Sequence, residues 1–199
     1  EVERLHESTN SAPLDSLPVF HGGWVGYFSY DTVRYVEAKL ANTVNGDTLN
    51  TPDILLMLAE EVVVFDNLRG TLTLIVSADT SQEDAFDSAN RRLLELESRL
   101  SEPMPPLTSF ELGATDTADI ESRVTFETDQ TTFESWVARI KDYILDGDVM
   151  QVVVSQRMTL PFHAEPLNLY RALRHLNPSP YLFYLDLDDF HVVGSSPEI

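Results

Sequence analysis

The sequence contains no cysteine and few basic residues, and both shortages restrict what the protein can do. Without cysteine, the chain can form no disulfide bond, carries no catalytic thiol and offers no thiolate ligand to zinc or iron. Lysine and arginine number 13 against 33 aspartates and glutamates, which gives a formal net charge of -20. No basic run interrupts this acidic excess, so we expect neither nucleic acid nor an anionic membrane surface as a partner.

Long apolar runs are also absent. No stretch approaches the length of a membrane span, and no signal peptide opens the chain, so we expect a cytoplasmic protein. The 199 residues are 43% apolar, which is enough for one large domain or two small ones. The chain begins at Glu1 rather than at a methionine and stops at S-S-P-E-I. We therefore expect it to be an internal piece of a longer protein.

The first half of the chain carries strand, hairpin and helix patterns. The aromatic alternation of residues 19–30 predicts a strand. Residues 61–65 and 71–76 flank D-N-L-R-G, which predicts a hairpin in which Gly70 takes a positive φ. A later stretch repeats apolar residues by threes and fours and predicts an amphipathic helix. These apolar residues are Phe86, Ala89, Leu93, Leu96 and Leu100.

Residues 101–124 combine P-M-P-P with scattered acids and show no sustained period, so we expect a linker there. Thr131 and Glu134 then have the spacing of a capping box ahead of an apolar stripe. This pattern predicts a helix that ends at Gly147.

Residues 147–157, G-D-V-M-Q-V-V-V-S-Q-R, alternate in the manner of a strand that follows a glycine turn. One face carries Gln151, Ser155 and Arg157, whereas the other face is apolar. On periodicity alone, the polar face could be a solvated face of an antiparallel sheet.

The remaining residues predict a helix and a second hairpin. Pro166 stands where a helix can begin, and N-P-S-P ends it. Residues 181–187 and 190–194 form the expected hairpin, and N-P-S-P-Y (177–181) could be only a helix stop followed by a turn. The order of elements indicates an α+β protein, with antiparallel sheets packed with flanking helices. The five histidines have no metal-ligand spacing, so we expect no metal site in this chain.

Three stretches together resemble anthranilate synthase component I. They are residues 22–37, 147–157 and 176–198, and they lie in the same order and at similar spacing in that family. The resemblance implies the two-sheet fold of the chorismate-utilising enzymes. It divides the chain into the remainder of an N-terminal regulatory domain (1–100), a linker (101–124) and the start of the chorismate-binding catalytic domain (125–199).

The family adds ammonia to chorismate and releases pyruvate to give anthranilate, with Mg²⁺ whose ligands are expected outside this chain. The resemblance implies that Glu198, in S-P-E, is the acid beside the leaving hydroxyl. It also places Gln151 where relatives that use water have a lysine base. Neutral ammonia already has a nucleophilic lone pair, so glutamine suffices. The polar face of 147–157 is then expected to line the chorismate cavity.

The resemblance also implies a regulatory site and a partner. Asn177, Pro180, Tyr181 and Leu182 match a segment that binds the feedback inhibitor L-tryptophan. A glutamine amidotransferase subunit, anthranilate synthase component II, supplies the ammonia in this family. We expect the 199-residue chain by itself to be inactive.

Two other functions stay open. Aminodeoxychorismate synthase component I shares the glutamine and the S-P-E glutamate, although Y-F-S-Y-D-T-V-R-Y-V-E (27–37) favours anthranilate synthase. A non-catalytic tryptophan-binding module is the alternative outside enzymology.

Overall fold

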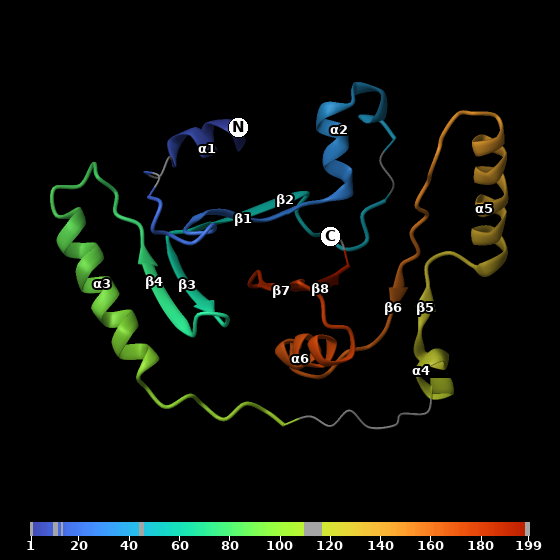
Figure 1. Ribbon diagram of the computed structural model, residues 1–199. Helices are drawn as coiled ribbons and strands as arrows, with labels where there is room; N and C mark the ends of the chain where they lie inside the picture. Colours follow the sequence, from blue (N-terminus) through green and yellow to red (C-terminus); the bar gives the residue numbers. More distant parts are fainter. Residues whose placement is uncertain (1, 10–11, 13, 44–45, 110–116, 198–199) are drawn as a thin grey trace. The chain divides into compact units, whose positions relative to one another are not determined.

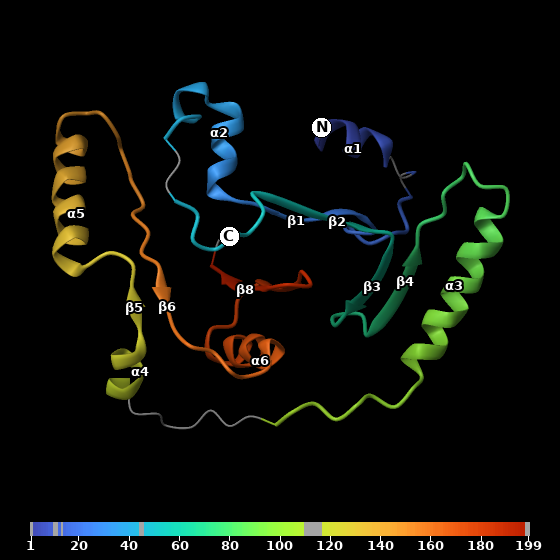
Figure 2. The same cartoon turned by 180° about the vertical axis from the view of Figure 1, so that it is seen from behind.

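A computed structural model describes residues 2–9, 12, 14–43, 46–109 and 117–197. Its contacts divide the chain into two compact units, Glu1–Pro106 and Leu107–Ile199. Both units combine helices with pairs of antiparallel strands, which confirms the α+β class (Figures 1 and 2).

The first unit contains three α-helices, two short 3₁₀ helices and two strand pairs among its described residues. The helices are α1 (Val2–Ser8), η1 (Tyr30–Thr32), α2 (Val33–Val36), η2 (Ala38–Leu40) and α3 (Ala85–Leu100), and the strands are β1 (Gly23–Phe28), β2 (Ile54–Ala59), β3 (Glu61–Asp66) and β4 (Thr71–Val76). The predicted aromatic strand is confirmed over β1. The other residues of the predicted strand, 19–22 and 29–30, lie outside β1, and Tyr30 begins η1.

Strand β2 was not predicted, although it is the partner of β1. The pair is antiparallel and runs from Gly23 opposite Ala59 to Phe28 opposite Ile54. The sequence of β2, I-L-L-M-L-A, is a continuous apolar run without alternation. Such a run does not distinguish a strand from a buried helix.

The hairpin β3–β4 and helix α3 confirm the predictions for residues 61–100. Gly70 has a φ of +66°, and the Asp66 carboxylate accepts hydrogen bonds from the amides of Leu68 and Arg69 at 3.0 and 2.9 Å. Helix α3 packs along β4 (Figure 1). Arg92 of α3 donates two hydrogen bonds, of 2.5 and 3.0 Å, to the Glu61 carboxylate of β3. This paired contact lowers the pKa of Glu61.

The second unit contains helices α4 (Thr117–Arg123), α5 (Gln130–Leu145) and α6 (Pro166–Leu176), and strands β5 (Thr125–Phe126), β6 (Met158–Thr159), β7 (Tyr181–Asp186) and β8 (His191–Ser196). Helix α6 and the hairpin β7–β8 confirm the predictions for the last third of the chain. Helix α6 contacts both strands of that hairpin. Helix α4 lies inside the stretch predicted as a linker, where residues 110–116 are outside the described residues.

Helix α5 begins where predicted, but its cap is different. Asp129 is the N-cap, and its carboxylate accepts from the Thr132 amide at 2.9 Å and from the Thr132 hydroxyl at 2.7 Å. Glu134 instead accepts a hydrogen bond from the Gln130 side chain at 2.6 Å. The capping box predicted for Thr131 and Glu134 is therefore wrong, because the upstream carboxylate supplies the cap.

The end of α5 at Gly147 is confirmed. The amide of Gly147 donates to the carbonyl of Ile144 at 3.2 Å, and the amide of Asp148 donates to the carbonyl of Tyr143 at 2.9 Å. These two bonds form a Schellman motif, in which Gly147 takes the required positive φ of +82°.

The cap at Asp129 leads to a prediction about pH. The hydrogen bond from the Thr132 amide, followed by that from the Thr132 hydroxyl, lowers the pKa of Asp129 below its usual 3.8. A lowered folded pKa means that the stabilisation is present above pH 3.8 and is lost as the pH falls through the folded value. At pH 6, Asp129→Ala should lower the urea midpoint of unfolding. Asp129→Asn should lose less, because it keeps an acceptor for the amide without the charge that the helix N-terminus favours.

The control is the pH dependence itself. The difference in urea midpoint between the parent and Asp129→Asn should shrink as the pH falls below 3.8. A difference that stays constant with pH would show that the carboxylate charge makes no contribution.

The strand predicted for residues 147–157 is wrong. Residues 151–157 form no strand, and only Met158 and Thr159 pair, as β6, with β5. Next to this short ladder, the Gln156 side chain donates to the Thr128 carbonyl at 2.5 Å and accepts from its amide at 3.2 Å. A strand needs a neighbour for its backbone hydrogen bonds, and alternation in one segment does not show whether that neighbour is present.

The described residues have a small hydrophobic core. Ile75 and Leu187 are the buried apolar residues, at 9% and 7% exposure. Many large apolar side chains are exposed to solvent, among them Trp136 at 42% and Met150 at 97% exposure. Each sheet has two strands, and a two-stranded sheet covers little apolar surface by itself. The assignment of residues 1–100 and 125–199 to a regulatory and a catalytic domain stays a prediction.

Candidate functional site

The segment predicted to bind tryptophan connects α6 to β7. Asn177 is the C-cap of α6, and its amide donates to the carbonyl of Leu173 at 2.8 Å. Pro180 immediately precedes β7, whose first two residues are Tyr181 and Leu182. Successive strand residues point to opposite faces, so Tyr181 and Leu182 do not share a face. A ligand that contacts both must reach the edge of the hairpin or use the backbone of one of them.

The exposure of these residues leaves them available to a ligand. Tyr181 is 56% exposed, Asn177 and Pro180 are exposed, and Leu182 is half-buried. Pro178 and Pro180 have fixed φ angles, so little backbone entropy would be lost when a ligand binds here. The geometry is compatible with the predicted role, which stays a prediction.

The hairpin places this segment next to the S-S-P-E sequence. In the antiparallel ladder, Tyr181 lies opposite Ser196 and Leu182 lies opposite Ser195. In addition to the backbone ladder, the Ser195 hydroxyl donates a hydrogen bond to the carbonyl of Asn177 at 2.6 Å. The Ser179 hydroxyl donates to the carbonyl of Ser196, and it accepts from the Tyr181 amide at 3.1 Å. Two serine side chains therefore join the two segments.

Of the two residues predicted to be catalytic, Gln151 and Glu198, only Gln151 is among the described residues. Gln151 is exposed, in the segment that forms no strand. Glu198 lies outside the described residues, two positions after Ser196 in the sequence. The catalytic roles of Gln151 and Glu198 stay predictions.

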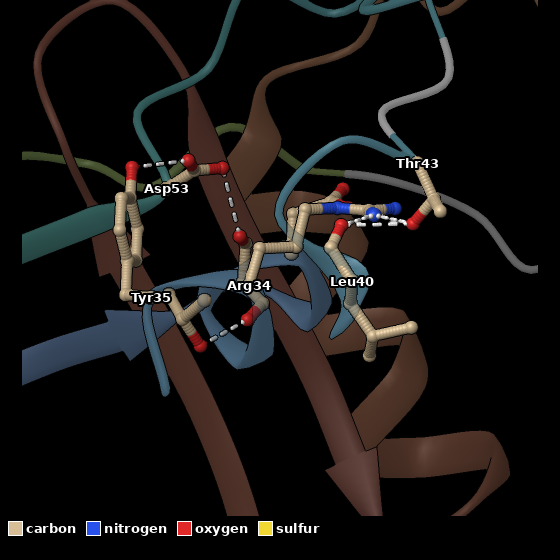
Figure 3. A network of polar contacts seen from close by, with 8 residues as sticks. Arg34, Tyr35, Leu40, Thr43 and Asp53 are labelled. Atoms are coloured by element: carbon tan, nitrogen blue, oxygen red, sulfur yellow. Dashed lines mark hydrogen bonds and ion pairs between the residues drawn. The ribbon is translucent and has the colours of Figure 1, made fainter. Parts of the chain in front are cut away.

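A polar network that was not predicted lies around the connection between β1 and β2 (Figure 3). The Asp53 carboxylate accepts hydrogen bonds from the Tyr35 hydroxyl at 2.8 Å and from the Ser29 hydroxyl at 3.1 Å. The Ser29 amide also donates to the Asp53 carbonyl at 2.7 Å. The hydrogen bond to Asp53, followed by the charge of its carboxylate, raises the pKa of Tyr35.

Arg34 donates further hydrogen bonds beside these residues. Its Nε donates to Asp31 Oδ1 at 2.6 Å, and its Nη1 donates to the Leu40 carbonyl at 2.9 Å and to Thr43 Oγ1 at 2.5 Å (Figure 3). The Arg34 side chain is only 15% exposed, whereas that of Asp31 is 49% exposed. The spacing of Asp31 and Arg34 in Y-D-T-V-R-Y could have suggested their pairing, because residues three apart are neighbours on a helix. The contacts to Leu40 and Thr43 had no sequence signal.

These hydrogen bonds stabilise the segment that connects β1 to β2. Among residues 2–9, 12, 14–43, 46–109 and 117–197, no three acidic or histidine side chains come together as a metal site would require. Within the same ranges, no helix is both long enough and apolar enough to cross a membrane.

Comparisons with known proteins cover the whole chain. A family model described as chorismate binding enzyme matches residues 1–199. "Anthranilate synthase component 1" of Pseudomonas aeruginosa is 52% identical over 198 residues, which are 100% of this chain and 40% of that protein. The protein of the same name from Neisseria meningitidis serogroup B is 48% identical over 202 residues, again 100% of this chain and 40% of the relative.

A solved structure is also similar. The crystal structure of anthranilate synthase component I from Streptococcus pneumoniae TIGR4 matches with a TM-score of 0.80 and 27% identity, over 99% of this chain and 43% of that one. The chain thus spans about 40% of the length of the curated relatives that it matches.

Proposed function

The chain belongs to the chorismate-binding enzyme family, and we propose that it is part of the large subunit of an anthranilate synthase. The proposed reaction converts chorismate and ammonia to anthranilate and pyruvate, as the first committed chemistry of tryptophan synthesis. The observation that carries the proposal is the 52% identity to a protein named anthranilate synthase component 1, which extends over the entire chain. The match to a solved component I structure that is 27% identical supports it as well.

The proposed chemistry assigns separate roles to two residues. Glu198 protonates the C4 hydroxyl of chorismate as that group leaves. Gln151 lies on the side of the incoming nucleophile. Its uncharged amide is sufficient there, because neutral ammonia needs no base to become nucleophilic. In the whole protein, we propose that residues 151–157 find a strand partner and that Gln151 then lines the cavity. Formation of such a ladder would also give the backbone groups of that segment their partners.

The remaining requirements are assigned to the part of the protein that this chain does not cover. The described residues do not bring together a metal-binding cluster, and we propose that the Mg²⁺ ligands lie in the rest of the subunit. A glutamine amidotransferase subunit is the proposed source of ammonia. The 199-residue chain alone is accordingly proposed to make no anthranilate.

Product analysis of the whole protein tests the proposed function. With chorismate, Mg²⁺ and ammonium, the expected product is anthranilate, detected by its fluorescence and by chromatography. Accumulation of aminodeoxychorismate without anthranilate would assign the protein to the aminodeoxychorismate synthases. Binding of tryptophan without consumption of chorismate would instead indicate a non-catalytic module.

Feedback inhibition by tryptophan gives the next prediction. In the whole protein, Leu182→Asp should raise the tryptophan concentration for half-inhibition by about 10-fold or more, since a carboxylate would have to be desolvated against an apolar ligand. Uninhibited turnover should stay close to the parent, because Leu182 is assigned to the regulatory site alone. Leu182→Met is the matched control, as it keeps an apolar side chain of similar volume. Equal inhibition of Leu182→Asp and the parent would remove Leu182 from the site.

A further inference from the structure

We propose that Ser179 and Ser195 are positioning residues that couple the inhibitor segment to the segment carrying Glu198. The inference rests on the proposed function, because it assigns a route of regulation to the same two sites. Neither serine is assigned to contact tryptophan or chorismate. Each acts through a backbone carbonyl of the other segment.

The two hydrogen bonds cross between the segments in opposite directions. Ser179 belongs to N-P-S-P and donates to the carbonyl of Ser196, which precedes P-E. Ser195 belongs to S-S-P-E and donates to the carbonyl of Asn177, which begins N-P-S-P. A displacement of either segment must therefore stretch a hydrogen bond to the other.

The sequence explains why side chains make this connection. The β7–β8 ladder ends with Tyr181 opposite Ser196. The next residues outward are Pro180 and Pro197, and proline has no amide hydrogen with which to continue a ladder. The hydroxyls of Ser179 and Ser195 supply the missing donors. The hairpin is thereby tied together at the end where its backbone cannot do so.

The hydrogen-bonded serines lie close in the chain to both proposed functional segments. Glu198 follows Ser196 by two residues, which span at most about 7 Å of chain, and the intervening Pro197 has a fixed φ. On the other side, the Tyr181 amide donates to the same Ser179 hydroxyl that reaches Ser196. Ser179 thus contacts the backbone of a proposed inhibitor-binding residue and the backbone leading to the proposed acid. A ligand that shifts Tyr181 changes the environment of this hydroxyl directly.

Removing the two hydroxyls should weaken inhibition by tryptophan without weakening the binding of tryptophan. Coupling between two sites is a free energy distinct from affinity at either one, and it typically changes binding by 5- to 150-fold. In the whole protein, Ser179→Ala and Ser195→Ala should bind tryptophan, measured by calorimetry without chorismate, within about threefold of the parent. Half-inhibition of turnover should require about 5-fold more tryptophan or more. Without tryptophan, kcat should fall while the KM for chorismate changes little, because Ser195 and Ser196, which lead to the proposed acid, are held less firmly.

Two comparisons control for general damage to the hairpin. Ser179→Thr and Ser195→Thr keep the hydroxyl and should restore inhibition. Tyr184→Phe removes a different hydroxyl from the same hairpin, one that lies 3.2 Å from Nδ1 of His191 near the turn. This variant should keep the inhibition and the kcat of the parent.

The outcomes distinguish failure of the coupling from failure of the proposed function. A parent protein that makes no anthranilate, or that binds no tryptophan, refutes the proposed function and the coupling with it. A parent that does both, with alanine variants inhibited at the parent's tryptophan concentration, refutes the coupling alone. Alanine variants that lose tryptophan binding in calorimetry also refute it, because the serines would then build the pocket itself.

Discussion

Replacing Glu198 with glutamine in the whole protein is expected to lower kcat with chorismate and ammonia by about 100-fold or more, the cost of removing a positioned general acid. Glutamine has nearly the same shape and cannot deliver a proton to the leaving hydroxyl. The KM for chorismate should change much less, because the lost interaction matters only in the transition state. Steady-state measurement of anthranilate fluorescence provides both constants.

The matched control is Asp189→Asn, which removes one carboxylate charge from the exposed turn between β7 and β8. Its kcat should equal that of the parent. If Glu198→Gln retained more than a tenth of the parent's kcat, another group would have to be the acid. A rise in KM with unchanged kcat would make Glu198 a binding residue.

Replacing Gly26 with alanine is expected to destabilise the pairing of β1 and β2 severely. A Cβ at this position would overlap the backbone carbonyl oxygen of Leu55 on the neighbouring strand. Backbone atoms held in a ladder cannot move aside as a flexible side chain can, so the cost should reach or exceed the upper end of the 1–3 kcal/mol that is typical of overpacking, or about 3 kcal/mol. That is a large share of the roughly 5–15 kcal/mol by which a protein is stable.

Urea denaturation of the whole protein, followed by tryptophan fluorescence, should show the loss through Trp24, which lies on β1. Gly46→Ala is the matched control, because a Cβ at Gly46 meets no atom within 4 Å. The two variants make the same chemical change and should differ widely in midpoint. Equal midpoints would mean that β1 and β2 do not approach as closely as described.

The local patterns of the sequence predicted the elements whose stability is largely local. The hairpin β3–β4 has its turn chemistry between two apolar strands, and α5 ends at a glycine with the required φ. Features that depend on distant residues were not predictable in this way. Strand β2 lacks the alternation that identifies a half-buried strand, and residues 151–157 have the alternation without a paired neighbour.

The candidate site shows the same limit. N-P-S-P-Y and S-S-P-E were identified by their resemblance to a family, and 20 residues lie between Asn177 and Glu198 in the sequence. The ladder register then places Leu182 opposite Ser195. The serine hydrogen bonds could not be predicted, because serines in such segments are equally typical of turns. Their role depends on a pairing that only the folded hairpin reveals.

The hairpin also restricts how this protein can change over evolutionary time. Gly194 of β8 lies opposite Phe183 of β7, and a Cβ at Gly194 would overlap the Phe183 ring. Alanine at position 194 therefore requires the ring to move away, whereas a smaller residue at position 183 would leave the glycine uncovered. The contact therefore links the residue types that the two positions can carry. Among relatives, a larger residue at position 194 should accompany a smaller one at position 183, so that the two positions vary as a pair.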